Sequence, residues 1–161
     1  MGQGEAETGP RGLGRPAATA RSALNRLGEE ATAEETCNAF VMVPVGTDPD
    51  TCRDLVLEVQ QALKSEAVSA GKTVGEFFPG HPMQGIHRTG FRPLAGPHPV
   101  LAVRAMVITD ILFLTLPGIP AAERLPCLKV WHSRFGEVTG GPWAQLHADA
   151  LAAAEKELDD R

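Results

Sequence analysis

The segment that most constrains the fold is 46–71, GTDPDTCRDLVLEVQQALKSEAVSAG, because it carries a complete set of helix signals. Asp48 can cap a helix, Pro49 suits the first helical position, and Gly71 suits the residue after the last turn. Between these ends, apolar side chains recur at helical spacing and form one stripe: Leu55, Val56, Val59, Ala62 and Leu63. The segment therefore predicts an amphipathic helix, whose apolar face must be covered by other elements.

Short apolar segments before and after this helix predict strands. Residues 39–45 (AFVMVPV) are rich in β-branched side chains, and the proline near the end favours an edge position. Three further strands are expected, at 73–79 (TVGEFFP), 99–108 (PVLAVRAMVI) and 109–117 (TDILFLTLP).

The C-terminal third predicts two helices, at 119–136 and 141–160. Pro126 is expected to kink or break the first of them. His132 and His147 lie on these helices and are expected at the surface or its boundary. Together the elements predict an α+β fold: a small, mostly antiparallel sheet with helices packed on it.

The N-terminal segment differs in composition from the rest. Residues 1–20 are rich in Gly, Ala and Pro without periodicity, which predicts a disordered tail. A short helix, marginal on its own, is expected within 18–30 and ends near Gly28. We therefore divide the chain into a disordered or weakly helical tail at 1–35 and a single α+β domain at 36–161.

Composition excludes several function classes. The net charge of −5 argues against nucleic-acid binding. No apolar run is long enough to span a membrane, and no secretion signal is seen. The three cysteines, Cys37, Cys52 and Cys127, fit neither a metal pattern nor a disulfide framework. A cytoplasmic protein with reduced thiols is expected, and a homo-oligomer is compatible with the sequence.

The stretch 75–107, GEFFPGHPMQGIHRTGFRPLAGPHPVLAVRAMV, carries the candidate chemistry. Arg104 lies in an otherwise apolar strand, where an unpaired guanidinium would be costly. It needs an anionic or strongly polar partner: an internal ion pair with Asp110 or Glu76, solvent at a sheet edge, or the carboxylate of a ligand or cofactor.

Glu76 and the histidines of this stretch leave several roles open. Glu76 is a solvent-facing residue, a partner for Arg104 or Arg92, or a catalytic acid/base. Three histidines could bind zinc or iron, although the spacing of His81, His87 and His98 matches no strong metal template. One imidazole could instead be an axial haem ligand, with arginines at the propionates. Histidines in loops are more often simply solvated.

The segment GEFFPGHPMQGIHRTGFRPLAGPHPVLAVRAMVITDILFL resembles a bacterial, largely actinobacterial, family known as a domain of unknown function. Members share a pattern of the form GEFH…G…LHN..FRPLRSP.P.LAIR.MV..D..FL. Positions matching it include Gly75, Glu76, Phe77, Gly85, His87, Phe91, Arg92, Pro93, Arg104, Asp110 and Phe113. The resemblance covers about 74–116 well and implies homology, and it names no activity.

A fainter similarity links the stretch to the YqcI/YcgG family, some members of which are haem-dependent N-hydroxylases. Phe78 stands where closer relatives carry the histidine of "FH", so His81 would have to replace that side chain. The resemblance therefore implies either an active haem protein or a shortened, non-catalytic form.

Two hypotheses about function follow from the sequence. The first is a small haem- or metal-dependent oxidative enzyme of bacterial secondary metabolism that binds a small-molecule ligand. Glu76 and His87 would be its catalytic residues, and His81, His87, Arg92 and Arg104 would hold the cofactor. The second is a non-catalytic binding or accessory module that uses the 75–107 loop.

Overall fold

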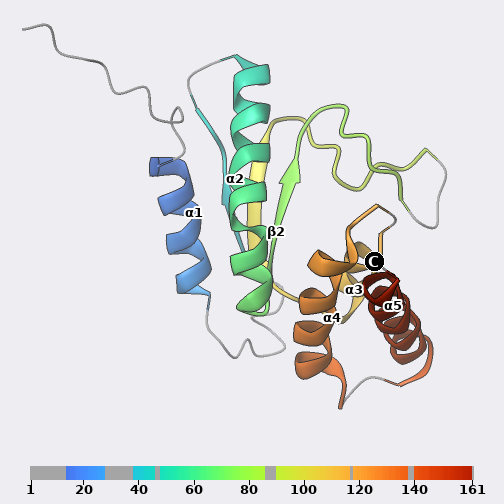
Figure 1. The fold of residues 1–161 in the computed structure, drawn as a ribbon. Coiled ribbons are helices and arrows are strands. Elements are labelled where there is room, and N and C mark those ends of the chain that lie inside the picture. The colour runs from blue at the N-terminus through green and yellow to red at the C-terminus, as the bar shows by residue number, and fades with distance from the viewer. Residues whose placement is uncertain are drawn as a thin grey trace, which may run out of the picture.

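The computed structural model describes residues 14–27, 38–45, 48–85, 90–116, 118–137 and 140–160. Within these ranges the helices pack on a small antiparallel sheet, which confirms the predicted α+β class (Figure 1). No helix in these ranges is long and apolar enough to cross a membrane.

Three strands form the sheet: β1 (Ala39–Met42), β2 (Lys72–Phe77) and β3 (Val100–Ala105). β3 is central and pairs antiparallel with both neighbours, so Arg104 lies opposite Ala39 on one side and Thr73 on the other. β1 is an edge strand, which agrees with the proline that follows it. Along β3 burial alternates, and the side chains that face the helices are the buried ones: Leu101, Val103 and Ala105.

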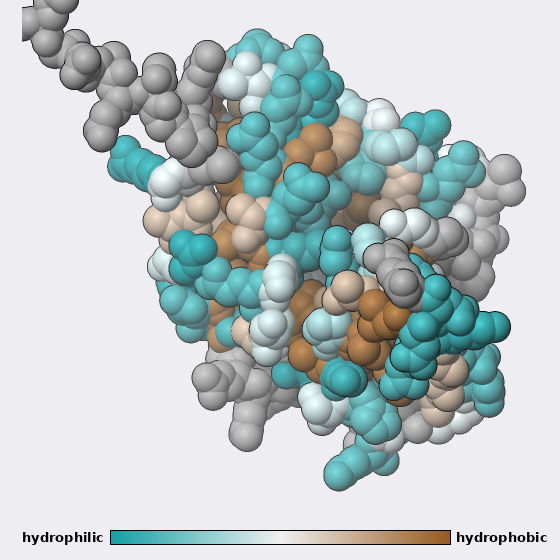
Figure 2. Space-filling view, viewed as in Figure 1, coloured by the Kyte–Doolittle hydropathy of each residue, from teal (hydrophilic) through white to brown (hydrophobic). Residues whose placement is uncertain are grey.

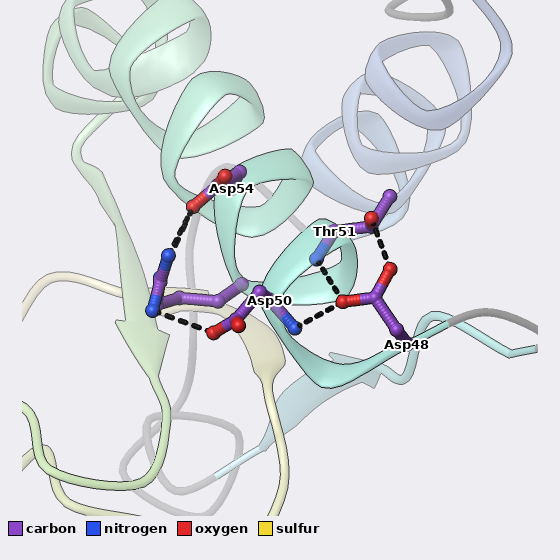
Figure 3. A network of polar contacts seen from close by, with 5 residues as sticks. Asp48, Asp50, Thr51 and Asp54 are labelled. Atoms are coloured by element: carbon purple, nitrogen blue, oxygen red, sulfur yellow. Dashed lines mark hydrogen bonds and ion pairs between the residues drawn. The ribbon is translucent and has the colours of Figure 1, made fainter.

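Helix α2 (Pro49–Ser69) follows the predicted pattern. Asp48 Oδ1 accepts the backbone N–H groups of Asp50 and Thr51 at 3.0 and 3.2 Å, and Figure 3 shows this carboxylate beside the first turn. The hydrogen bond from the Thr51 side chain, followed by that from its backbone, lowers the pKa of Asp48 below its usual value. Gly71 follows the helix with a positive φ of 65°, the conformation that favours glycine.

Helix α1 (Gly14–Arg26) starts earlier than the composition suggested, so the expectation of disorder is wrong for residues 14–20. Ala20 and Leu24 are buried against α2 and the sheet. Lys72, itself buried, donates a hydrogen bond of 2.6 Å to the Leu24 carbonyl near the end of the helix. Tertiary contacts thus stabilise a helix that would be marginal alone.

The segment 109–117 was predicted as a strand, and this prediction is wrong. A short 3-10 helix (Ile108–Asp110) leads directly into helix α3 (Ile111–Leu114). Asp110 Oδ2 accepts the backbone N–H of Val107 at 2.8 Å, which stabilises the turn at this point. The sheet therefore has three strands in the described ranges, where four were expected.

Helix α4 (Ala121–Phe135) continues through Pro126, so the predicted break does not occur. A proline in a helix interior costs about 3 kcal/mol because it removes a hydrogen bond and crowds the preceding turn. Buried side chains on either side, Ala121 before the proline and Leu128 and Trp131 after it, anchor both parts of the helix in one core.

Helix α5 (Gly141–Asp159) packs against α4, with Pro142 in its first turn as predicted. His147 is buried, which corrects the expectation of a surface position. Its ring stacks on Trp131 with centroids 5.2 Å apart, and its Nε2 lies 3.1 Å from the Leu128 carbonyl oxygen. His132 is exposed, as expected.

Two hydrophobic clusters make up the core. The first lies between the sheet, α1 and α2, and the second joins α3, α4 and α5 beyond the end of β3. α2 contributes to both, because Val68 near its C-terminus belongs to the second cluster. Figure 2 shows hydrophobic surface between neighbouring helices, whereas the outer face of α2 is mostly hydrophilic.

Candidate binding loop between β2 and β3

Backbone hydrogen bonds hold the connection between β2 and β3 in shape. The Phe78 N–H donates to the Leu94 carbonyl at 3.2 Å, and the Gly96 N–H donates to the Phe78 carbonyl at 3.4 Å. Farther out, the Gly85 N–H donates to the Phe91 carbonyl at 2.7 Å. Backbone hydrogen bonds therefore join the segment that leaves β2 to the segment that leads back to β3 at two places, around Phe78 and at Gly85.

The imidazole of His81 lies inside this connection. It is 5% exposed, and its ring contacts that of Phe78 with centroids 4.5 Å apart. Nδ1 accepts the backbone N–H of Met83 at 3.2 Å, and Nε2 lies 3.5 Å from Glu76 Oε1. In this arrangement Nδ1 is the hydrogen-bond acceptor and Nε2 is the ring nitrogen that faces Glu76. Glu76 and His81 thus lie together, as two of the predicted site residues.

Arg92 is the third predicted site residue in this region. Its Nη1 lies 3.4 Å from the Gly80 carbonyl and 3.3 Å from the His81 carbonyl, and donates to both. The guanidinium therefore fastens the returning segment to the turn that carries His81. The preceding residue, Phe91, is a large aromatic with 53% of its surface exposed.

Arg104 lies apart from these residues. In the sheet register Arg104 is opposite Thr73, whereas Glu76 is opposite Leu101, three pairs away and on the other face. The guanidinium meets Asp110 in a two-pronged pair: Nη1 donates to Oδ2 at 2.8 Å and Nη2 to Oδ1 at 2.6 Å. Of the partners considered from sequence, the geometry favours Asp110.

The side chain of Arg104 is partly hydrated, although the strand that carries it is otherwise apolar. Its side chain is 33% exposed, whereas that of Asp110 is only 2% exposed. The acid is the buried member of the pair, and the guanidinium reaches it from a partly hydrated sheet face. This ion pair joins β3 to the turn before α3.

The hydrogen bonds of His81 do not suit an imidazole that binds haem iron or another metal ion. A histidine that binds a metal through one ring nitrogen normally donates the hydrogen on the other nitrogen. In His81 the second nitrogen accepts instead, from Met83. No group of three or more His, Cys, Asp or Glu side chains suited to a metal occurs in the part of the chain that the structure describes.

Two further histidines belong to this stretch, His87 and His98. His98 is exposed. His87, a candidate catalytic and cofactor-binding residue, lies outside the described residues, as does Cys37. Cys127 is partly buried, and burial raises its pKa above the ordinary value, which disfavours a reactive thiolate.

Glu58 is a residue that the sequence interpretation passed over. It lies on α2 at the rim of a groove that also takes in Met42 and Leu101. The only available signal was its position off the apolar stripe, which is ordinary for a charged residue on an amphipathic helix. The groove is lined by residues of four elements, α1, β1, α2 and β3, so the pattern of a single element could not reveal it.

Comparison with known proteins places the chain in a family. The profile of a family described as a domain of unknown function (DUF6875) matches residues 5–140, and the chain belongs to this family. No curated protein and no solved structure matches it.

Proposed function

We propose that this member of the DUF6875 family is a binding module, and that its β2–β3 connection docks on a partner protein. One observation carries the proposal: Phe91 is 53% exposed on a segment whose backbone is tied in place. A backbone held in position loses little conformational freedom on binding, so burying the aromatic that it carries contributes more to affinity than burying one on a mobile segment would.

Arg92 beside it supports the same function. Aromatic residues and arginine are enriched at protein interfaces and dominate their binding energy. The guanidinium contacts two backbone carbonyls through Nη1, and the residue as a whole is exposed. Its other N–H groups can therefore donate to a carboxylate or carbonyl of the partner. We expect a partner surface with an apolar pocket next to an acidic group.

The experiment is affinity capture from cells that produce the protein natively, using wild type, Phe91→Ala and Phe113→Ala. Phe113 is the matched control, because it is an aromatic with 39% exposure on α3, away from the loop. A partner captured by wild type and by Phe113→Ala is then purified. Phe91→Ala should bind it about tenfold more weakly or worse. Equal binding by all three proteins would rule out the loop as the docking surface.

A haem- or metal-dependent oxidative enzyme of secondary metabolism is the competing proposal. Its support is the resemblance to YqcI/YcgG proteins together with the contact of 3.5 Å between Glu76 and His81. Because His81 does not fit a ligand, the iron would have to be bound by His87. The freshly purified protein should then show a strong Soret band that His87→Ala alters. A protein that stays colourless after addition of hemin would exclude haem.

A further inference from the structure

A groove lies between the start of α1, the end of β1 and the first half of α2. Its volume is about 680 Å³, within the range of roughly 300–1,000 Å³ typical of sites for small organic molecules. The groove is separate from the β2–β3 connection, because none of its lining residues comes from that segment.

Apolar side chains form most of the surface of the groove. Val56, Val59 and Leu101 are core residues that also line it, so they make its floor. Val43 and Val45 extend the apolar surface outward and are 56% and 92% exposed. Apolar groups left in water at such a site favour an apolar ligand, because binding removes their surface from water.

The charges at the rim are of one sign. Asp54 and Glu58 both line the groove, and no lysine, arginine or histidine does so among the described residues. Arg53, outside the lining, donates to Asp54 Oδ1 from Nε at 3.0 Å and Nη2 at 2.8 Å, which offsets that carboxylate. Glu58 has no such partner within the ranges that the structure describes, so its charge is available to a ligand.

We propose that this groove binds a small amphipathic molecule that combines an apolar body with an ammonium group. The apolar body lies on Val56, Val59 and Leu101, and the ammonium group pairs with the Glu58 carboxylate. An anionic ligand is disfavoured, because it would meet the Glu58 carboxylate and no cation among the lining residues. This site is independent of the proposed docking loop.

Three probes that share the dansyl fluorophore test the proposal. Dansylcadaverine carries an ammonium group, dansylamide is neutral and dansylglycine carries a carboxylate. The blue shift and gain of dansyl emission in an apolar site report binding to the full chain. Dansylcadaverine should bind most tightly and dansylglycine least tightly, and the difference should shrink as the ionic strength rises.

Two variants locate the site. Glu58→Gln removes the rim charge at nearly constant size, and should weaken dansylcadaverine by about two- to fivefold, as for one partly exposed ion pair. Dansylamide should bind this variant like wild type. Thr19→Trp places an indole into the groove from an exposed position on α1, and should weaken all three probes.

Glu155→Gln is the matched control. It removes one negative charge from an exposed position on α5, so the net charge becomes less negative by the same amount as in Glu58→Gln while the groove is untouched. The proposal is supported if Glu155→Gln still binds dansylcadaverine more tightly than dansylglycine and Glu58→Gln does not. Absence of binding by any probe, equal affinity for dansylglycine, or an unchanged preference in Glu58→Gln would each overturn the proposal.

Discussion

At one end of β3, Arg104 and Asp110 meet through two hydrogen bonds of 2.8 and 2.6 Å, and the acid is buried. At the other end, Glu76 Oε1 and His81 Nε2 lie 3.5 Å apart, and Nδ1 of the same imidazole accepts from Met83. In each pair a buried side chain, Asp110 or His81, meets a partner that is more exposed. Only the first has the charge and geometry of a strong ion pair.

The difference explains why Arg104 occurs in an otherwise apolar strand: the fold brings Asp110 to it as a partner. Asp110 also accepts the Val107 N–H, so the Arg104 pair stabilises the turn that leads into α3. His81 instead accepts the Met83 N–H and contacts Phe78, which holds the shape of the loop. The first pair stabilises the connection between β3 and α3, whereas the second helps to hold the β2–β3 connection that carries Phe91.

The largest expected effect is that of Asp110→Ala. The substitution removes the carboxylate that accepts from the Arg104 guanidinium and from the Val107 N–H, and leaves Arg104 Nη1 with only the Ala105 carbonyl. We expect a loss of about 3 kcal/mol in the free energy of unfolding, at the lower end for a broken buried pair because Arg104 is partly hydrated. Urea denaturation followed by circular dichroism measures it. A loss below about 1 kcal/mol would mean that the pair contributes little to the fold.

The double variant Arg104→Met with Asp110→Asn is the control for this prediction. It removes both charges and keeps the size of both side chains, so no buried charge is left unpaired. It should be more stable than Arg104→Met alone. A double variant whose loss equals the sum of the losses in Arg104→Met and Asp110→Asn would argue against coupling between the two residues.

A smaller effect is expected for His81→Ala. The substitution removes the contact with Phe78 and the acceptor for Met83, at a cost of about 1–2 kcal/mol. Amide hydrogen exchange should speed up at Met83 and Gly85 and stay unchanged in α4. His98→Ala is the matched control, because His98 is exposed, and it should leave both measurements as in wild type.

The smallest effect is expected for Glu76→Gln. The contact of 3.5 Å between Glu76 Oε1 and His81 Nε2 is longer than a strong hydrogen bond, so we expect a change within about 0.5 kcal/mol. The same denaturation experiment measures it. A loss above about 1 kcal/mol would show that this contact contributes as much as a strong ion pair, and the two ends of β3 would then be alike.

Much of the fold could be predicted because its signals are local. The cap at Asp48 and the glycine at 71 act within one turn of the chain, so α2 could be placed correctly. Segment 109–117 could not be placed, since ILFL suits a strand or a helix equally. Its helix depends on Asp110, whose main partner is six residues earlier in a different element.

The candidate site was predictable in part for a similar reason. Glu76, His81 and Arg92 belong to one short stretch, and the structure brings them together through contacts within that stretch. Arg104 was grouped with them from sequence, but strand pairing places it three pairs from Glu76 on the opposite face. Register depends on the whole sheet and is not encoded near either residue.

The sequence by itself determined the α+β class and the amphipathic helix at 49–69, because capping and periodicity are properties of consecutive residues. Tertiary structure alone decided that His147 is buried against Trp131, that Arg104 pairs with Asp110, and that a groove opens beside Glu58. Each of these depends on side chains from different elements, whose distance is set only when the elements pack.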